Sequence, residues 1–258
     1  MAHDPPPGIT VSVPRLMLGG TLLFADLSCR FEAGTWTCLL GPSGVGKTTL
    51  LRLIAGLVEG GRVAADDGRP LTGRIALMAQ QDLLLPWLNV LDNTLLGHRL
   101  RGEDAGGRAR RERRARELLA RLGLGHRLTA LPAELSGGMR QRVALARTLL
   151  EERPVVLMDE PFSALDAISR HRLQETAARL LDRHTVLLVT HSPLEALRLG
   201  HRILVMGGQP VTLREIAAPP GPPPRPLGDP GLLALEAGLL EELAASDARM
   251  EEAWASAP

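Results

Sequence analysis

Short apolar runs recur along the chain, and each ends in a polar or glycine-rich turn. They occupy residues 35–40, 74–78, 154–158, 185–189 and 202–206. Several are hydrophobic throughout instead of alternating, which is typical of strands that are covered on both faces. Helical patterns lie between them, after residue 47 and over residues 170–183. This alternation predicts an α/β domain built on a layered, mostly parallel sheet.

Polar motifs follow three of these predicted strands. A glycine-rich loop at 41–48 follows the first run, Asp159 and Glu160 close the third, and His191 follows the fourth. In open parallel sheets, ligands bind beyond the carboxyl ends of the strands. We therefore expect these three loops to share one edge of the sheet.

The amino-acid composition changes between residues 78 and 135, where arginine, glycine and helix-favouring stretches become more frequent. This change predicts an α-helical subdomain inserted at about 81–150. Its run 108–121 is basic but is interrupted by Glu112 and Glu117. We interpret this run as a solvated helix face, and a nucleic-acid contact is the lesser alternative.

The pattern of alternating strands and helices ends near residue 217, which divides the chain into two parts. We expect an α/β domain at 9–217, followed by a tail at 218–258. Within the tail, residues 219–226 form a proline-rich linker without a helix or strand pattern. Residues 232–243 predict a short amphipathic helix that packs on the domain.

Composition narrows the class of protein. The chain has 258 residues, 45% of them apolar, and a formal net charge of +1, which argues against a nucleic-acid partner. Cys29 and Cys38 lie in or near predicted buried strands, so we expect two reduced thiols and not a disulfide. The first residues lack the pattern of a signal peptide, and no apolar run approaches the length of a membrane span. Any membrane role is therefore expected to act through a partner.

Lys47 is the only lysine of the chain, and it lies in the glycine-rich loop. A compact ammonium group fits a tight backbone cradle between phosphates, where a planar guanidinium does not. The pattern G-x-x-x-x-G-K-[ST] turns backbone N–H groups inward, and the following helix adds the positive end of its dipole. The loop consists of Gly41, Pro42, Ser43, Gly44, Val45, Gly46, Lys47 and Thr48. It predicts a bound nucleoside triphosphate.

Two acids end the apolar run 154–158. In phosphoryl transfer the first acid holds Mg²⁺ together with the hydroxyl of the phosphate loop, here Asp159 with Thr48. The second acid, Glu160, can polarise an attacking water. A solvated strand end is the alternative for paired acids, and it does not account for the lysine cradle in the same chain.

The most specific stretch is Leu-Ser-Gly-Gly-Met-Arg-Gln at residues 135–141. Ser136 can cap a helix, and Gly137 and Gly138 leave bare N–H groups at its start, which predicts a second anion site. A capped helix start alone would not demand two adjacent glycines. The inner face of this helix is expected to contain Met139, Val143, Ala146 and Leu150.

With these motifs the chain resembles the ATP-binding-cassette (ABC) ATPases, from about residue 11 to residue 206. The resemblance implies an ABC-type fold with an antiparallel β edge. It also implies a homodimer in which each ATP lies between the phosphate loop of one copy and the Leu-Ser-Gly-Gly signature helix of the other. Catalytic roles fall to Lys47, to Glu160 as the residue that activates water, and to His191 as the switch histidine. The resemblance adds as nucleotide ligands Thr49, Ser136, Gly137, Gly138, Gln141 and Asp166.

The same resemblance places Mg²⁺ on Thr48, Gln80 and Asp159. Gln80 is chosen over Gln81 because the family pattern puts a proline six positions after the glutamine, and 86 − 80 is 6.

Residues 79–93 look like the nitrate, sulfonate and taurine importer group, including its branch for hydroxymethylpyrimidine, a thiamine precursor. In such proteins the loop corresponding to 80–87 meets an integral-membrane permease, whereas the alternative is a hydrophobic turn in the core. The resemblance thus implies a peripheral subunit on the cytoplasmic face of the plasma membrane, in a complex with an external solute-binding protein. The ATPase does not touch the cargo, so the oxoanion, sulfonate, bicarbonate and pyrimidine classes all stay open.

One position departs from the family pattern. ABC ATPases commonly stack the adenine on an aromatic residue before the phosphate loop, and Leu18 stands at the matching position. A leucine covers the base without an aromatic stack, so we expect Leu18 to bind the nucleotide with weak base discrimination. Phe24 is expected to pack in the core instead.

Three other classes of protein share some of these motifs. ABC ATPases of DNA repair, chromosome structure or translation usually carry two cassettes, a long coiled coil or zinc modules, and this sequence has none of these. A small-molecule kinase shares the phosphate loop but gives no reason for the signature at 135–141. An exporter subunit stays open, because the permease sets the direction of transport.

Overall fold

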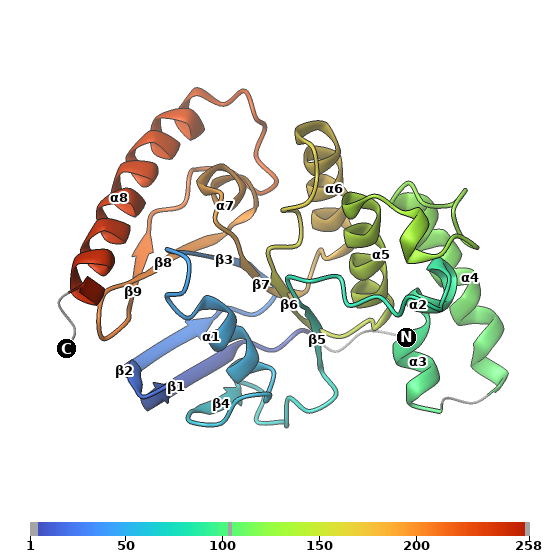
Figure 1. Ribbon diagram of the computed structural model, residues 1–258, viewed down its shortest axis with the longest axis horizontal. Helices are drawn as coiled ribbons and strands as arrows, with labels where there is room; N and C mark the ends of the chain where they lie inside the picture. Colours follow the sequence, from blue (N-terminus) through green and yellow to red (C-terminus); the bar gives the residue numbers. More distant parts are fainter. Residues whose placement is uncertain (1–4, 103–104, 256–258) are drawn as a thin grey trace.

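The computed structural model describes residues 5–102 and 105–255, and Figure 1 shows their arrangement. A six-stranded sheet has the order β5-β6-β7-β3-β8-β9, in which the first five strands are parallel and β9 is antiparallel to β8. The strands are β3 (Trp36–Leu40), β5 (Ile75–Met78), β6 (Val155–Asp159), β7 (Thr185–Val189), β8 (Arg202–Gly207) and β9 (Thr212–Ile216). The five apolar runs of the sequence are therefore the five parallel strands, as predicted.

Three other strands form a separate antiparallel sheet with the order β2-β1-β4. They are β1 (Ile9–Leu18), β2 (Thr21–Phe31) and β4 (Arg62–Ala65). Buried and exposed residues alternate along the first half of β1, so one face of this sheet packs on the core. This sheet and β9 confirm the expected antiparallel edge.

Helices flank the sheets and build the region between β5 and β6. They are α1 (Lys47–Ile54), α2 (Val90–Thr94), α3 (Leu96–Leu100), α4 (Ala105–Arg121), α5 (Gly137–Leu150), α6 (Ala167–Leu180), α7 (Pro193–Leu199) and α8 (Pro230–Ala255), with a 3₁₀ turn at Pro132–Glu134. In Figure 1, α4 and α8 lie at opposite ends of the molecule. Among the described residues, no helix combines the length and apolar character that crossing a membrane requires.

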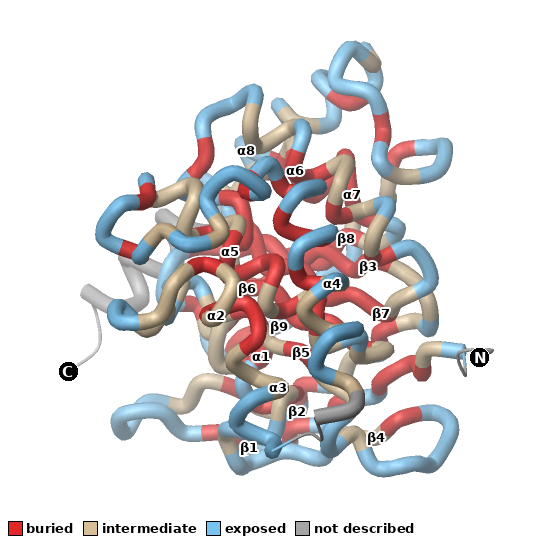
Figure 2. Tube along the Cα trace, turned by 90° about the vertical axis from the view of Figure 1, so that its right-hand side faces the viewer, coloured by how far each residue is buried: buried red, intermediate tan, exposed pale blue. Residues whose placement is uncertain are grey.

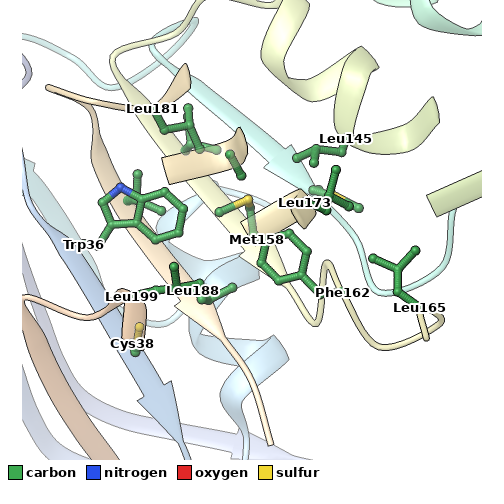
Figure 3. Packing of buried hydrophobic residues seen from close by; sticks show 14 of the residues in the cluster. Trp36, Cys38, Leu145, Met158, Phe162, Leu165, Leu173, Leu181, Leu188 and Leu199 are labelled. Carbon is green, nitrogen blue, oxygen red and sulfur yellow. The ribbon is translucent and has the colours of Figure 1, made fainter. Parts of the chain in front are cut away.

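The parallel sheet is covered on both faces because successive side chains of a strand point in opposite directions. Cys38 and Leu40 of β3 join a core with α5, α6 and α7, whereas Leu39 joins a second core with α1 and β1. Figure 3 shows the first core, in which Met158 and Phe162 lie together. The buried segments, red in Figure 2, concentrate on these strands.

The basic run at 108–121 forms the outer face of α4. The inner face of this helix holds the buried residues Ala115, Leu118 and Leu119, while Arg116 forms an ion pair with Glu112 over 2.7 Å. The arginines of this run therefore form an exposed helix face, and the choice against a nucleic-acid contact stays a prediction.

Two helices differ from the predictions in their bounds. Helix α6 begins at Ala167 and not at residue 170, because Asp166 Oδ1 accepts a hydrogen bond from Ser169 N at 3.0 Å and caps it. Helix α8 extends to Ala255, well beyond the predicted end at residue 243. The apolar periodicity stops near residue 243, but the alanine and glutamate residues that follow favour the helix without it.

The proline-rich segment at 219–226 contains no helix or strand, as predicted, but it is not a loose connection. Pro219 and Arg225 are buried, and α8 packs on the domain through Leu232 and Leu239. The division at residues 217 and 218 stays a prediction. Both cysteines are free thiols, and burial raises the pKa of Cys29 to about 12.

We predict that α8 contributes to the stability of the domain. Leu232 is 0% exposed and Leu233 is 54% exposed, so the two adjacent leucines form a matched pair. Leu232→Ala should lower the free energy of unfolding by about 2–5 kcal/mol, because it leaves a cavity in the core. Leu233→Ala should change it by less than about 0.5 kcal/mol. Denaturant unfolding measures both, and equal effects would contradict the packing of α8.

Candidate functional site

The phosphate loop connects β3 to α1 through backbone conformations that require glycine. Gly41 has φ 151° and Gly46 has φ 106°. A Cβ atom on Gly41 would lie 2.4 Å from the carbonyl oxygen of Met206, so no other residue fits there. Val45 is buried and anchors the loop in the core, whereas Ser43 and Gly44 are exposed at its tip.

Lys47 lies inside this loop. Its Nζ atom donates hydrogen bonds to the carbonyl oxygens of Gly41 and Pro42, both at 2.7 Å. The side chain is buried, so the ammonium group is held close to the backbone that an incoming phosphate would face. This placement agrees with the predicted cradle.

Thr48 and Asp159 lie together, as the sequence predicted. The Thr48 hydroxyl donates to Asp159 Oδ2 at 2.7 Å, although 111 positions separate the two residues in the chain. Burial raises the pKa of Asp159, and the hydrogen bond from Thr48 opposes that rise. A carboxylate and a hydroxyl are oxygen donors of the kind that Mg²⁺ prefers, so these residues fit the predicted metal.

Two of the predicted residues, His191 and Gln80, contact the carboxylate of a third, Glu160. Glu160 Oε2 lies 3.2 Å from His191 Nδ1 and 3.3 Å from Gln80 Nε2. Glu160 has φ 48°, a left-handed conformation that is uncommon for a residue with a side chain and that marks many functional sites. His191 is 65% exposed in its side chain, so this cluster faces solvent.

Gln141 connects the signature helix α5 to the loop after β6. Its Nε2 atom donates to the carbonyl oxygen of Glu160 at 2.9 Å, and its Oε1 atom accepts from Ala164 N at 3.0 Å. Ser163 Oγ donates to the same Glu160 carbonyl at 3.1 Å. Sequence reasoning missed this positioning role, because nothing in the residue spacing shows that the amide turns inward. The predicted contact of Gln141 with nucleotide stays a prediction.

Asp166, another predicted nucleotide ligand, is exposed and caps α6 in this chain. The hydrogen bond from the backbone of Ser169 lowers the pKa of this carboxyl. The structure therefore explains its presence by local capping, and its nucleotide contact stays a prediction. Thr49 lies half-buried in the first turn of α1.

The signature helix begins as predicted. Ser136 Oγ accepts a hydrogen bond from Met139 N at 3.3 Å, and the predicted inner face is buried, with Met139 partly so. The two glycines differ in their surroundings. A Cβ atom on Gly138 would lie 2.8 Å from Leu165, but one on Gly137 would meet nothing closer than 3.8 Å. Internal packing therefore explains Gly138 and leaves Gly137 unexplained.

Leu18 ends β1 and is 57% exposed, whereas Phe24 is fully buried and contributes to the core behind Gly46. The expectation that Phe24 packs in the core is confirmed. The contact of Leu18 with a base stays a prediction.

The loop at 80–87 exposes apolar side chains. Trp87 is 71% exposed and Leu83 is 58% exposed, which excludes a buried turn. The buried Asn93 holds the backbone of this loop, since its Nδ2 atom donates to the carbonyl oxygens of Leu85 and Leu88 at 3.1 and 2.7 Å. A cleft of about 400 Å³ lies between this loop, the start of α5 and Ser163.

Comparison with known proteins shows the family to which the chain belongs. The model of the ABC transporter family matches residues 24–163. The chain is 46% identical over 231 residues to an aliphatic sulfonates import ATP-binding protein, SsuB 1, of Rhodococcus jostii, covering 88% of this chain and 89% of that protein. It is 41% identical to the protein of the same name from Pseudomonas savastanoi, with 91% and 95% covered. An uncharacterized ABC transporter ATP-binding protein of Haemophilus influenzae is 43% identical, with 88% and 95% covered.

Solved structures give the same result for the fold. The ATP-binding cassette MJ0796, as a dimer in a post-hydrolysis state bound to ADP and phosphate, superposes with a TM-score of 0.71 at 28% identity. The match covers 83% of this chain and all of that one. The family match, the relatives and the convergence of the motif residues lead to one conclusion. The chain belongs to the ABC transporter family and is an ATP-binding subunit that hydrolyses ATP to drive transport.

Proposed function

We propose that this chain powers an importer for aliphatic sulfonates, within the wider class of nitrate, sulfonate, taurine and hydroxymethylpyrimidine-like cargoes. Its relatives in Rhodococcus jostii and Pseudomonas savastanoi carry the name of sulfonate import proteins, and they support this cargo. The observation that carries the chemistry is the cluster of Gln80, Glu160 and His191 beside the pair formed by Thr48 and Asp159.

Hydrolysis requires a positioned water and compensation of negative charge on the phosphates. Lys47 and the N–H groups of the phosphate loop would bind the phosphates. Thr48, Asp159 and Gln80 would hold Mg²⁺, which would supply additional positive charge at the phosphate oxygens when bound. Glu160 would orient the attacking water and accept its proton, and His191 would hold the γ-phosphate in line.

We propose that hydrolysis takes place between two copies of the chain. Each ATP would lie between the phosphate loop of one copy and the start of α5 of the other. Gly137 supports this arrangement, because a side chain there would meet no packing within its own chain. A requirement for glycine at this position would therefore come from a group outside the chain, such as a nucleotide bound by the other copy. The dimeric form of the similar cassette MJ0796 supports the same pairing.

The permease would dock on the loop at 80–87, at the cytoplasmic face of the membrane. The exposed Trp87 and Leu83 supply the apolar contacts that protein interfaces use. Movement of this loop would reach the catalytic cluster through Gln80, which hydrogen-bonds Glu160. An external solute-binding protein would deliver the cargo to the permease.

Reconstitution tests the proposed cargo. The ATPase, its permease and the solute-binding protein, placed together in lipid vesicles with ATP, should take up labelled alkanesulfonate. Uptake of only taurine, nitrate or a pyrimidine would reassign the cargo. ATP hydrolysis stimulated by DNA instead of by the permease would reject transport in favour of a DNA-repair type of ABC ATPase.

The first prediction concerns Gln141. Gln141→Leu should lower kcat for ATP hydrolysis about tenfold, equivalent to about 1.4 kcal/mol, because the loop that carries Glu160 loses its connection to α5. ATP affinity should change little. Thr148→Val is the matched control, since it removes a buried hydroxyl of the same helix that donates to the carbonyl oxygen of Ala144. Steady-state kinetics measure both variants, and equal losses would contradict the positioning role.

The second prediction concerns the dimer. Glu160→Gln should slow hydrolysis about a hundredfold or more and trap an ATP-bound dimer, because water is no longer activated. Adding Gly137→Ala should abolish that dimer, since the methyl group has room within its own chain but would meet the partner's γ-phosphate. Size exclusion with multi-angle light scattering measures the mass. A monomeric Glu160→Gln protein at saturating ATP would reject the two-copy site.

The third prediction concerns the permease. Trp87→Ala should leave basal ATP hydrolysis within about twofold and reduce its stimulation by the permease at least about tenfold, as for a buried aromatic at an interface. Leu100→Ala is the matched control, because Leu100 is also a strongly exposed apolar residue of the helical subdomain but lies outside the loop. Equal loss of basal and stimulated activity would show that Trp87 supports the fold and not docking.

A further inference from the structure

A cluster of buried polar side chains joins α7 to α6 and to the proline-rich segment. Gln174, Glu195, Arg198 and Arg225 are exposed by only 3%, 5%, 2% and 4%, respectively. Burying charged groups is costly unless each is paired or hydrogen-bonded. The cluster therefore needs a complete set of partners, and those partners come from α6, α7 and the proline-rich segment.

Arg225 closes the end of α7. Its Nη1 atom donates to the carbonyl oxygens of Leu197 and Gly200 at 2.7 and 2.8 Å. The last carbonyl groups of a helix have no partner within the helix, and a cation there interacts favourably with the helix dipole. The backbone is fastened at the same point, because Arg225 N donates to Arg198 O and Arg198 Nε donates to Arg225 O, both at 3.0 Å.

The side of α7 is joined to α6. Glu195 Oε1 accepts a hydrogen bond from Gln174 Nε2 at 2.7 Å, and Arg198 Nη1 donates to Gln174 Oε1. Both ends of the Gln174 amide, the donor and the acceptor, are therefore hydrogen-bonded to α7. Helix α6 starts immediately after the loop at 163–166 that holds the carbonyl oxygen of Glu160.

The start of α7 holds the loop that carries His191. Ser192 Oγ accepts from Glu195 N at 3.3 Å and caps the helix, and Thr190 Oγ1 accepts from Ser192 N at 3.1 Å. Burial raises the pKa of the Glu195 carboxyl, and the nearby Thr190 hydroxyl opposes that rise. Both neighbours of His191 are therefore bound to α7 or to its cap, so the position of the histidine follows the position of the helix.

We infer that Arg225 is a positioning residue for hydrolysis: it locks α7 from the C-terminal segment and thereby holds His191 against Glu160. This inference rests on the role proposed above for His191. Residues 219–226 are then part of the catalytic scaffold, although they lie outside the sequence motifs. A contact that displaced this segment would release α7 and slow hydrolysis without touching the nucleotide.

A double-mutant cycle tests the inference, with radiolabelled ATP and single-turnover hydrolysis followed over hours. Arg225→Ala should lower the rate about tenfold and keep KM for ATP within about twofold, since the phosphate loop is untouched. In the His191→Ala background, the same change should cost no further rate, because two residues that act through one another are not additive. The rate measured for the Glu160→Gln protein gives the background of the assay.

Two controls separate positioning from general stability. Val11→Ala removes two methyl groups from a fully buried site in β1, so it destabilises the chain without contacting α7, and its rate should stay near that of the wild type. Arg225→Lys keeps the charge but lacks the Nε atom, which donates to the carbonyl oxygen of Pro220 at 3.3 Å, so it should fold and show an intermediate rate. If Arg225→Ala does not fold, the cycle is run with Arg225→Lys.

The outcomes are distinct. Rate losses that multiply in the two backgrounds would overturn the positioning role of Arg225 and leave that of His191 intact. A His191→Ala protein with wild-type rate would instead reject the proposed role of His191. A rate loss in Val11→Ala equal to that in Arg225→Ala, at equal melting temperature, would also overturn the inference.

Discussion

The parallel pairing of β6, β7 and β3 is the constraint on which the site depends. In the observed register Asp159 lies opposite Val189, and Val189 lies opposite Leu39. The residues that follow these positions, Glu160 and the phosphate loop among them, must therefore emerge at the same edge of the sheet. A shift of one residue would turn every side chain of a strand to the other face, so the two packed cores on either side of the sheet would both have to repack.

Polar contacts couple the helical region to this edge, in addition to the apolar core that α5 shares with β3. Gln141 reaches from α5 to the carbonyl oxygen of Glu160, and Arg140 Nε pairs with Asp82 Oδ2 at 3.0 Å on the loop that begins at Gln80. Hydrogen bonds are directional, so these contacts fix the orientation of the loop that carries Glu160 relative to α5.

Much of this arrangement could be predicted from the sequence because it is local or periodic. The apolar runs identified the parallel strands, and fixed spacing identified Lys47, Asp159 and Ser136. The family resemblance supplied His191 and Gln80. Contacts between distant segments carry no such signal. Arg225 lies between two prolines, and no sequence pattern indicates that it is buried against a helix. Likewise, no pattern indicates that the amide of Gln141 turns inward.

The single lysine has a practical consequence for chemical study of this protein. Reagents that modify amines find one side chain, Lys47, and it is buried in the phosphate loop with its Nζ atom engaged by two carbonyl oxygens. Apart from the α-amino group, amine labelling therefore reports on the nucleotide pocket alone. Lysine-directed crosslinkers cannot map its neighbours, so carboxylate- or arginine-directed chemistry is the suitable choice for that purpose.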